Sequence, residues 1–377
     1  MKNKFLALIV LAFLTLNLLA QVVENPIITA VPSLSIAPDA RGGGMGDVGA
    51  ATAPDVNSQY WNPSKYVFME SETGVSLSYT PWLRKLVTDI DLAYLSGYYK
   101  FDQRQAVSMS LRYFSLGDIT LMDEFGIPGN VAHPNEFAID AAYSLKLSEK
   151  LSGSVALRFI YSDLGNGSGN VEMFPGAAVA ADISAYYRTP LAIQGIDGTL
   201  GFGLNISNIG SKISYDQNTT SNFIPTNFRL GASYDYPIDN YNKISVSADI
   251  NKLLVPTPKL NATLQDIQDY NNMSPLTGIF NSLSYAPNGF AEKLDEIMWS
   301  VGAEYAYNNQ FFVRGGYFNE SQFKGNRKYF TAGAGFKLNV FQLDAAYVIS
   351  TSQTNPLDQT LRFTLSFDLF GMKNLVK

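Results

Sequence analysis

One short stretch near the N-terminus has the spacing of a phosphate-binding turn. Gly44 to Gly49 read GMGDVG and fit the pattern G-x-G-x-x-G. In a dinucleotide-binding fold, such glycines follow a buried strand, open a long helix and let backbone N–H groups approach a pyrophosphate. Here Pro38 stands where that strand would run, and the apolar pattern after Gly49 stops at Ala53-Pro54. These neighbours argue against a nucleotide site, so the glycines need another explanation.

The rest of the chain offers few residues that could carry out catalysis or hold a metal or cofactor. There is no cysteine, and His133 is the only histidine. Neither a histidine-based catalytic triad nor a multi-histidine metal site can be assembled from one such residue. Asp266 and Asp269 lack the spacing and the glycine of a calcium-binding EF-hand loop. We therefore expect no catalytic, metal or cofactor site and no enzymatic activity.

Residues 1–20 have the features of a secretory signal peptide. Lys2 and Lys4 precede an apolar run from Phe5 to Leu14, and the segment closes on the small residue Ala20. The apolar run is about half as long as a membrane-spanning helix requires. Cleavage after Ala20 would remove two lysines and change the formal net charge from −6 to −8.

Composition narrows the class of protein further. Charged residues make up only 16% of the chain, whereas aromatic residues reach 13%. After residue 20 there is no run of 18 apolar residues, which excludes helical membrane spans. A mildly acidic, charge-poor chain is also a poor candidate for nucleic-acid binding. The remaining classes are a large secreted β protein and an outer-membrane β-barrel.

From Thr73 onward, apolar residues alternate with polar or small residues, as expected of β-strands. In the last segment, LRFTLSFDLF, Leu361, Phe363 and Leu365 point one way and Arg362 and Thr364 the other. The pattern predicts fourteen strands, at residues 73–82, 90–101, 105–116, 136–147, 150–162, 176–188, 198–209, 226–236, 242–254, 297–307, 310–318, 328–339, 341–350 and 359–370.

The connections between these strands alternate between short and long. The short ones include 102–104, 148–149 and 189–197, and the long ones include 117–135, 211–225 and 255–296. This asymmetry is typical of up-and-down outer-membrane barrels, which have short periplasmic turns and long outward loops. The sequence therefore predicts an all-β, 14-stranded antiparallel up-and-down transmembrane β-barrel at residues 73–370. Because the strand number is even, we expect both chain ends in the periplasm.

The two faces of the predicted strands differ in charge. The outward sets contain no charged residue, whereas fourteen charges fall on inward positions, seven of each sign. They are Arg112, Asp140, Lys146, Arg158, Asp182, Arg229, Asp235, Asp249, Glu304, Arg314, Lys337, Asp344, Arg362 and Asp368. A balanced lining favours internal ion pairs over a strongly charge-selective open pore.

The glycine motif lies in residues 21–72, which precede the first strand and lack strand alternation. We expect this segment to fill part of the lumen as an N-terminal plug. Its glycines would then permit positive φ and close approach to the inner wall, with Arg41 and Asp47 available to pair with lumen charges. A short tail, 371–377, follows the last strand.

Several stretches of the chain resemble the PorV family. They are PDARGGGMGDVGAATAPDVNSQYWNPSKY (residues 38–66), VGAEYAYNNQFFVRGGYFNE (301–320), GNRKYFTAGAGFK (325–337) and LRFTLSFDLF (361–370). The plug signature contains Arg41, Gly42, Gly44, Met45, Gly46, Asp47 and the pair Asn62-Pro63. PorV proteins are outer-membrane proteins of the type IX secretion system of Bacteroidetes, related to the 14-stranded FadL-type fatty acid transporters. The chain departs from many barrels by continuing past its last strand.

The resemblance implies a shuttle and not an enzyme. Proteins of this family receive secreted cargo, marked by a C-terminal signal domain, at the translocon. They deliver it to a cell-surface sortase complex, which attaches it to lipopolysaccharide. On this basis we expect the protein in the outer membrane of a Gram-negative, Bacteroidetes-type bacterium. The expected partners are the translocon, secreted cargo, the sortase and outer-membrane lipid or lipopolysaccharide, with no nucleic acid.

Two outward loops are candidate partner-binding surfaces. The loop at 255–296 is far longer than ordinary loops and is rich in apolar residues. These are Leu276, Ile279, Phe280, Leu283, Tyr285 and Phe290, followed by a predicted short helix at 291–298. The loop at 117–135 contributes Leu121, Met122 and Phe125, with Ile127 nearby. An alternative is that the longer loop folds down over its own lumen.

Two other functions remain open at this point. The first is FadL-like transport of fatty acids or other hydrophobic compounds, which would need an apolar pocket in the lumen. The second is an accessory role in lipopolysaccharide modification.

Overall fold

The structure is a computed structural model that describes residues 25–122, 125–165, 173–216, 220–351 and 357–369. The predicted signal peptide (1–20) and C-terminal tail (371–377) lie outside the described residues. No helix in the described part of the chain is long and apolar enough to cross a membrane.

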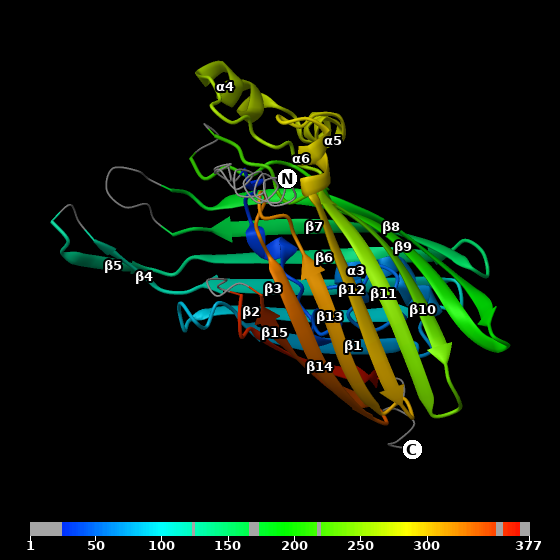
Figure 1. Cartoon of the computed structure of the whole chain (residues 1–377). Helices are drawn as coiled ribbons and strands as arrows, with labels where there is room; N and C mark the ends of the chain where they lie inside the picture. Colours follow the sequence, from blue (N-terminus) through cyan, green and yellow to red (C-terminus); the bar gives the residue numbers. More distant parts are fainter. Residues whose placement is uncertain (1–24, 123–124, 166–172, 217–219, 352–356, 370–377) are drawn as a thin grey trace, which may run out of the picture.

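Fourteen antiparallel strands close into one barrel, with β1 paired to β16 (Figure 1). They are β1 (Thr73–Pro81), β2 (Ile90–Lys100), β3 (Gln105–Leu116), β6 (Asn135–Lys146), β7 (Leu151–Asp163), β8 (Gly176–Ile193), β9 (Ile196–Gly210), β10 (Asn227–Pro237), β11 (Asn242–Leu253), β12 (Ile297–Tyr307), β13 (Phe311–Asn319), β14 (Lys328–Leu338), β15 (Phe341–Ser350) and β16 (Leu361–Asp368). The predicted barrel and its strand number are confirmed.

The period-two pattern places apolar residues outside and polar residues inside. In β3, Met109 and Leu111 are exposed on the outer face, while Ser110 and Arg112 are buried. In β16, Phe363 is exposed and Arg362 is buried. The exposed set is apolar because it faces lipid in a membrane barrel, where a charge near the midplane costs about 2–4 kcal/mol.

The connection between β8 and β9 is shorter than predicted. The alternation predicts strands at 176–188 and 198–209, joined by a connection at 189–197. Instead, pairing continues through Pro190↔Thr199 to Ile193↔Ile196. Gln194 and Gly195 form the turn, both with positive φ (53° and 81°). The predicted boundaries of these two strands were therefore wrong at this end.

The long connections contain strands and helices at positions where the sequence pattern predicts mostly loop. The connection after β3 forms a two-stranded hairpin of β4 (Ile119–Met122) and β5 (Pro128–Ala132). The connection after β11 contains α4 (Leu264–Asn272), α5 (Pro275–Ser284) and α6 (Phe290–Asp295). The helix predicted at 291–298 is thus shorter, since Met298 belongs to β12. We call this end of the barrel, which carries the long connections, the outer rim.

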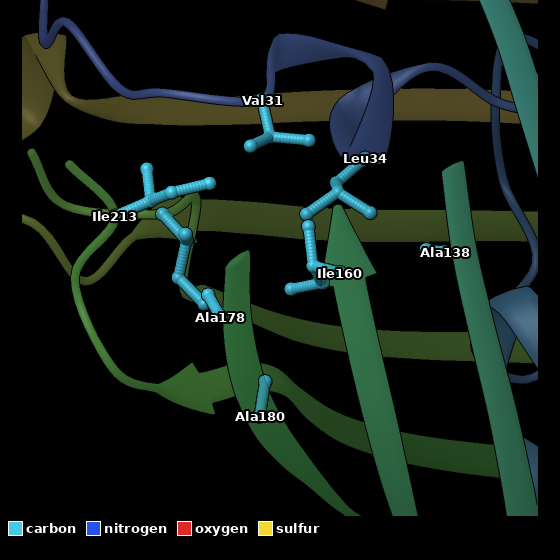
Figure 2. Close-up of a cluster of buried hydrophobic side chains, with 8 residues drawn as sticks. Val31, Leu34, Ala138, Ile160, Ala178, Ala180 and Ile213 are labelled. Carbon is cyan, nitrogen blue, oxygen red and sulfur yellow. The ribbon is translucent and has the colours of Figure 1, made fainter. Parts of the chain in front are cut away.

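The N-terminal segment runs through the barrel. It contains four short helices, η1 (Pro32–Ser35), α2 (Ala40–Gly43), α3 (Ser58–Trp61) and η2 (Pro63–Phe68). Figure 2 shows Val31 and Leu34 pointing toward Ile160 and Ile213, with which they form a buried apolar cluster. Figure 1 shows the continuation of this segment, with α3, within the ring of strands.

The described chain starts and ends at opposite ends of the barrel. The expectation that both chain ends lie in the periplasm concerns residues 1–24 and 370–377, which lie outside the described residues. Asn25 lies at the outer rim, where its N–H donates to Phe323 O (2.9 Å) and its side chain to Pro258 O (3.1 Å). Asp368, at the end of β16, donates its N–H to Val340 O in the short turn between β14 and β15. The even strand number fixes only where the strands begin and end, and residues 25–72 cross the barrel before β1.

Candidate functional site

The glycine motif binds an anion through its backbone, but that anion belongs to the barrel wall. Asp249 on β11 points inward, and its Oδ2 accepts hydrogen bonds from the N–H groups of Gly49 (2.8 Å) and Ala50 (3.0 Å). Gly46 donates its N–H to Thr331 Oγ1 on β14 (2.8 Å). The donors that would cradle a phosphate in a nucleotide site are thus used to fasten the segment to the barrel.

The glycines are also required by close packing. Gly46 has a φ of +75°, and a Cβ there would lie 2.7 Å from the backbone N of Tyr317. The backbone of Met45 approaches the inward glycines Gly302 and Gly316 so closely that a Cβ on Gly316 would lie 2.1 Å from Met45 C. Gly44 packs against Gly333, and Gly42 against the Trp61 ring. Wall and segment both use glycine where their backbones meet.

Arg41 joins the segment to a buried charge network in the wall. Its guanidinium contacts Asp55 (2.8 Å) and Glu304 on β12 (3.1 Å). Arg314 on β13 then links Glu304 (2.6 Å) to Asp344 on β15 (2.6 Å). Both Arg314 and Glu304 are almost completely buried. This confirms that inward charges form ion pairs, because burial of unpaired charges would cost several kcal/mol each.

Other residues of the plug signature make equally specific contacts. Asp47 accepts from Arg362 on β16 (2.7 Å) and from Tyr329 Oη (2.5 Å). Asn62 donates from Nδ2 to Ala50 O (3.0 Å) and to Ala185 O on β8 (2.9 Å). Pro63 is buried, and its carbonyl accepts a hydrogen bond from Ser144 on β6 (2.9 Å). All eight predicted plug residues therefore lie in one region of the lumen.

Several residues of the same interface were not singled out from the sequence. Asp39 accepts from the indole Nε1–H of Trp61 (2.6 Å), and Gln59 donates to Asp140 on β6 (2.5 Å). Lys65 is buried, with its ammonium on Gly49 O (2.8 Å). No local pattern marks these pairs, because each depends on where two remote segments meet.

Residues 39–65 divide the space inside the barrel. On the side of the short turns lies a polar cavity of about 460 Å³, which Arg41 and Glu304 border. On the other side lies a chamber of about 80 Å³. Nearer the outer rim is a mainly apolar pocket of about 300 Å³, lined by Trp82, Ile90 and Phe114 among others.

The helices of the connection 255–296 present apolar side chains to solvent. Of the six residues predicted there, five are exposed by between 43% and 76%, and Ile279 is half-buried. The exposed residues are Leu276, Phe280, Leu283, Tyr285 and Phe290. No residue of α4 is buried. Figure 1 shows α4 and α5 standing above the strand ends and not inside the ring.

These helices are held at the rim by their neighbours. Thr263 and Asp266 form a capping box on α4, and Ser274 caps α5 ahead of Pro275. Lys212 donates to the carbonyl of Asn271 at the end of α4 (2.7 Å). Near α6, Glu292 accepts from Lys324 (2.6 Å) and from Asn25 (3.2 Å). The base of this connection is therefore polar and ordered, while its helices remain exposed.

The hairpin β4–β5 forms a second apolar surface at the outer rim. Met122 and Phe125 are 56% and 80% exposed, and Ile127 is 60% exposed. Leu121 belongs to β4, but its side chain lies outside the described residues. His133 lies at the base of this hairpin, with Nδ1 2.6 Å from the carboxylate of Asp118, and both side chains are exposed.

Comparisons with known proteins agree with this architecture. The family profile described as "Type IX secretion system protein PorV" matches residues 20–260. A comparison with curated proteins found no match. Among solved structures, the toluene transporter TodX of Pseudomonas putida aligns with a TM-score of 0.53 at 10% identity, covering 88% of this chain and 97% of that one.

Two further structures align less closely. The toluene transporter TbuX of Ralstonia pickettii has a TM-score of 0.45 at 12% identity, over 88% of this chain and 96% of that one. A FadL homologue of Pseudomonas aeruginosa has a TM-score of 0.43 at 10% identity, over 92% and 99%. At these identities the likeness concerns the fold alone, whereas the profile covers more than half of the sequence, including the whole plug signature. The chain belongs to the PorV family of outer-membrane type IX secretion system proteins.

Proposed function

We propose that this component of the type IX secretion system binds secreted cargo at the translocon and carries it to the cell-surface sortase. Cargo would be recognised through its C-terminal signal domain and finally attached to lipopolysaccharide by the sortase complex. In this proposal the protein acts by binding and release and catalyses no reaction.

The observation that supports this proposal best is the position of the exposed apolar residues. Leu276, Phe280 and Phe290 lie on helices α5 and α6 at the outer rim, and all three side chains are exposed. Exposed apolar patches on soluble surfaces often mark binding sites. The lumen, by contrast, is occupied by the protein's own residues 39–65, so a folded cargo would be engaged at the rim and not passed through the barrel.

This proposal also sets the orientation of the barrel. The outer rim faces the cell surface of a Bacteroidetes-type bacterium, and the short turns face the periplasm, as in other outer-membrane barrels. Asp368 would then lie near the periplasm, and Asn25 near the cell surface.

The test uses tagged full-length protein in its native cells. The variant Leu276→Ser/Phe280→Ser/Phe290→Ser removes three exposed apolar side chains and leaves the helix caps intact. We expect recovery of secreted proteins with the C-terminal signal domain to fall at least about tenfold, since central apolar anchors carry most of an interface's free energy.

A second variant, Met122→Ser/Phe125→Ser/Ile127→Ser, alters the hairpin by the same chemistry and serves as the matched comparison. If cargo recovery falls in only one of the two variants, the surface altered in that variant is the one that binds cargo. If both variants insert normally and recover cargo as the wild type does, the rim is not the binding surface. If the wild type recovers no such cargo, the shuttle proposal is wrong.

A second candidate function is transport of small hydrophobic molecules. It is supported by the apolar pocket near the outer rim, where Trp82, Leu83, Phe114 and Leu116 enclose about 300 Å³. Toluene, the compound named for two of the similar barrels, provides a probe of suitable size. Saturable quenching of Trp82 fluorescence by toluene, lost in Ile90→Asp, would support this function. Equal quenching in Trp82→Phe would refute it.

A further inference from the structure

The chamber of about 80 Å³ above residues 39–65 lies inside the barrel and has both polar and apolar residues in its lining. Its volume is several times the roughly 10–15 Å³ that one water molecule needs. Four arginines, Arg112, Arg158, Arg229 and Arg327, and two carboxylates, Asp47 and Asp140, line it together with Tyr60 of the N-terminal segment. The chamber therefore has room for a small polar ligand and carries more positive than negative side chains.

Arg112 on β3 is a buried cation that forms no ion pair within the described ranges, although the buried carboxylates of Glu136 and Asp140 act on its charge from farther away. Its side chain is almost fully buried, and within the described ranges no carboxylate lies within 4.0 Å of its guanidinium. Nη1 donates only to the backbone carbonyls of Ser33 and Ile36, the latter at 2.9 Å. By contrast, Arg158 is paired with Asp140 (3.1 Å) and Asp182 (2.8 Å). An uncompensated buried charge is costly, and an anion would relieve that cost.

Arg229 on β10 approaches the same place. Its guanidinium lies 5.8 Å from the centroid of the Tyr60 ring, and that of Arg112 lies 5.0 Å from the same centroid. The nearest carboxylate to Arg229 is Asp249 at 3.5 Å, whose Oδ2 already accepts from Gly49 and Ala50. Two guanidinium groups thus flank one aromatic ring, and the donors of Arg112 are only partly used.

Two acceptor atoms on the chamber wall lack a hydrogen-bond donor in the part of the chain described. The side-chain oxygens of Asn205 and Asn251 are buried and have no hydrogen-bond partner in the part of the chain described. Both residues line the chamber. A protonated phosphate oxygen, or water held by a bound anion, would supply the missing donors.

We infer that this chamber binds a small oxyanion, a carboxylate or phosphate group, held between Arg112 and Arg229 above Tyr60. Guanidinium groups suit this ligand because their planar N–H donors match two oxygens of a carboxylate or phosphate. The bound anion would give Arg112 an ion-pair partner and stabilise the packing of residues 33–36 above it.

The group can arrive free or as part of a lipid. Five residues, Ser35, Ala37, Asp47, Arg327 and Tyr329, line both the chamber and the apolar pocket near the outer rim. An acyl chain in that pocket would place its carboxylate or phosphate near the chamber. A free ion has no acyl chain to place in the apolar pocket, so that pocket would not increase its affinity.

The test is thermal unfolding of the purified full-length protein in detergent. Inorganic phosphate or acetate replaces chloride at constant ionic strength. We expect a saturable rise of about 2 °C or more in Tm, because a ligand that binds only the folded state stabilises it by mass action. In Arg112→Gln and Arg229→Gln this rise should disappear. Arg188→Gln should retain it, since Arg188 stacks over Phe68 (5.4 Å) at the opposite end of the barrel.

Octanoate distinguishes the two sources of the group. If octanoate raises the Tm at concentrations at least about tenfold lower than acetate does, the site takes the carboxylate of a lipid. If the two anions raise the Tm at equal concentrations, the site takes a free ion. The inference is overturned if none of these anions raises the Tm of the wild type, or if both arginine variants respond as the wild type does. Should Arg112→Gln fail to fold, Arg229→Gln and calorimetric titration of the wild type with phosphate decide the question. None of these results depends on cargo binding.

Discussion

The interface inside the barrel and the helices at the outer rim are built in opposite ways. Inside, the charged side chains from Asp39 to Lys65 all have a hydrogen-bond or ion-pair partner, and the backbones approach at glycines. At the rim, α4 buries no residue, and Phe280 and Phe290 are more than two-thirds exposed. An unpaired polar group is costly when it is buried, which favours hydrogen bonds and ion pairs in the lumen, whereas exposed apolar groups leave contact area free for another molecule.

The comparison predicts that structural stability resides in the first region and partner binding in the second. Substitutions that break contacts in the lumen should therefore unfold the protein, and substitutions in the rim helices should not. The following predictions run from the largest expected change to the smallest.

The largest effect is expected for Arg314→Met. This change leaves Glu304 and Asp344 buried with one partner fewer, because both carboxylates contact Arg314 at 2.6 Å. Breaking a buried ion pair costs about 3–5 kcal/mol. Urea unfolding in detergent should show a loss of this size. In the exposed pair Arg84–Asp91, Arg84→Met should cost about 0–1 kcal/mol. If both variants lose a similar amount of unfolding free energy, the buried ion pairs of Arg314 contribute no more to stability than the exposed pair Arg84–Asp91.

A smaller loss is expected for Gly203→Ala on β9. The added Cβ would lie 1.9 Å from Ala50 O, and backbone cannot move aside as a flexible side chain can. Overpacking of this kind costs about 1–3 kcal/mol. Gly153→Ala on β7 is the matched control, because the nearest atom to its Cβ would lie at 3.6 Å. If both variants unfold at the same urea concentration, the close fit between wall and N-terminal segment is not a source of stability.

The rim variant Phe280→Ser should leave the free energy of unfolding within about 0.5 kcal/mol of the wild type. Phe280 is 68% exposed, so its removal creates no cavity. Its effect should be found in cargo recovery and not in the urea midpoint. A large loss of stability would show that α5 is part of the fold's core and not a free surface.

The smallest effect concerns pH and α4. The hydrogen bond from Lys259 to Asp266 (2.6 Å), with further hydrogen bonds from Thr263, lowers the pKa of Asp266 below its ordinary value of 3.8. A carboxyl whose pKa is lower in the folded state stabilises that state above the ordinary value, and this stabilisation is lost as pH falls below it. Hydrogen-exchange protection of α4, corrected for intrinsic rates, should therefore drop between pH 5 and pH 3. In Asp266→Asn, protection should be weaker at pH 5 and nearly independent of pH.

Two helices at the outer rim have start signals in the sequence that the prediction above does not use. Thr263 and Asp266 have the capping-box spacing, and Ser274-Pro275 is a typical helix start, so α4 and α5 were predictable. The turn at Gln194-Gly195 lies inside the predicted connection 189–197, most of which pairs as strand. These errors concern element boundaries inside connections and not the architecture.

The sequence by itself determined the barrel. Alternation of side chains along a strand depends only on neighbouring residues, so strand number, the apolar outer face and the inward charges could all be predicted. Only the tertiary structure decided which inward group meets which partner. Asp249 reaches Gly49 from 200 residues away, and Arg362 reaches Asp47 from 315. Such pairs arise because the barrel closes around the N-terminal segment, and no local pattern encodes where that segment stops against the wall.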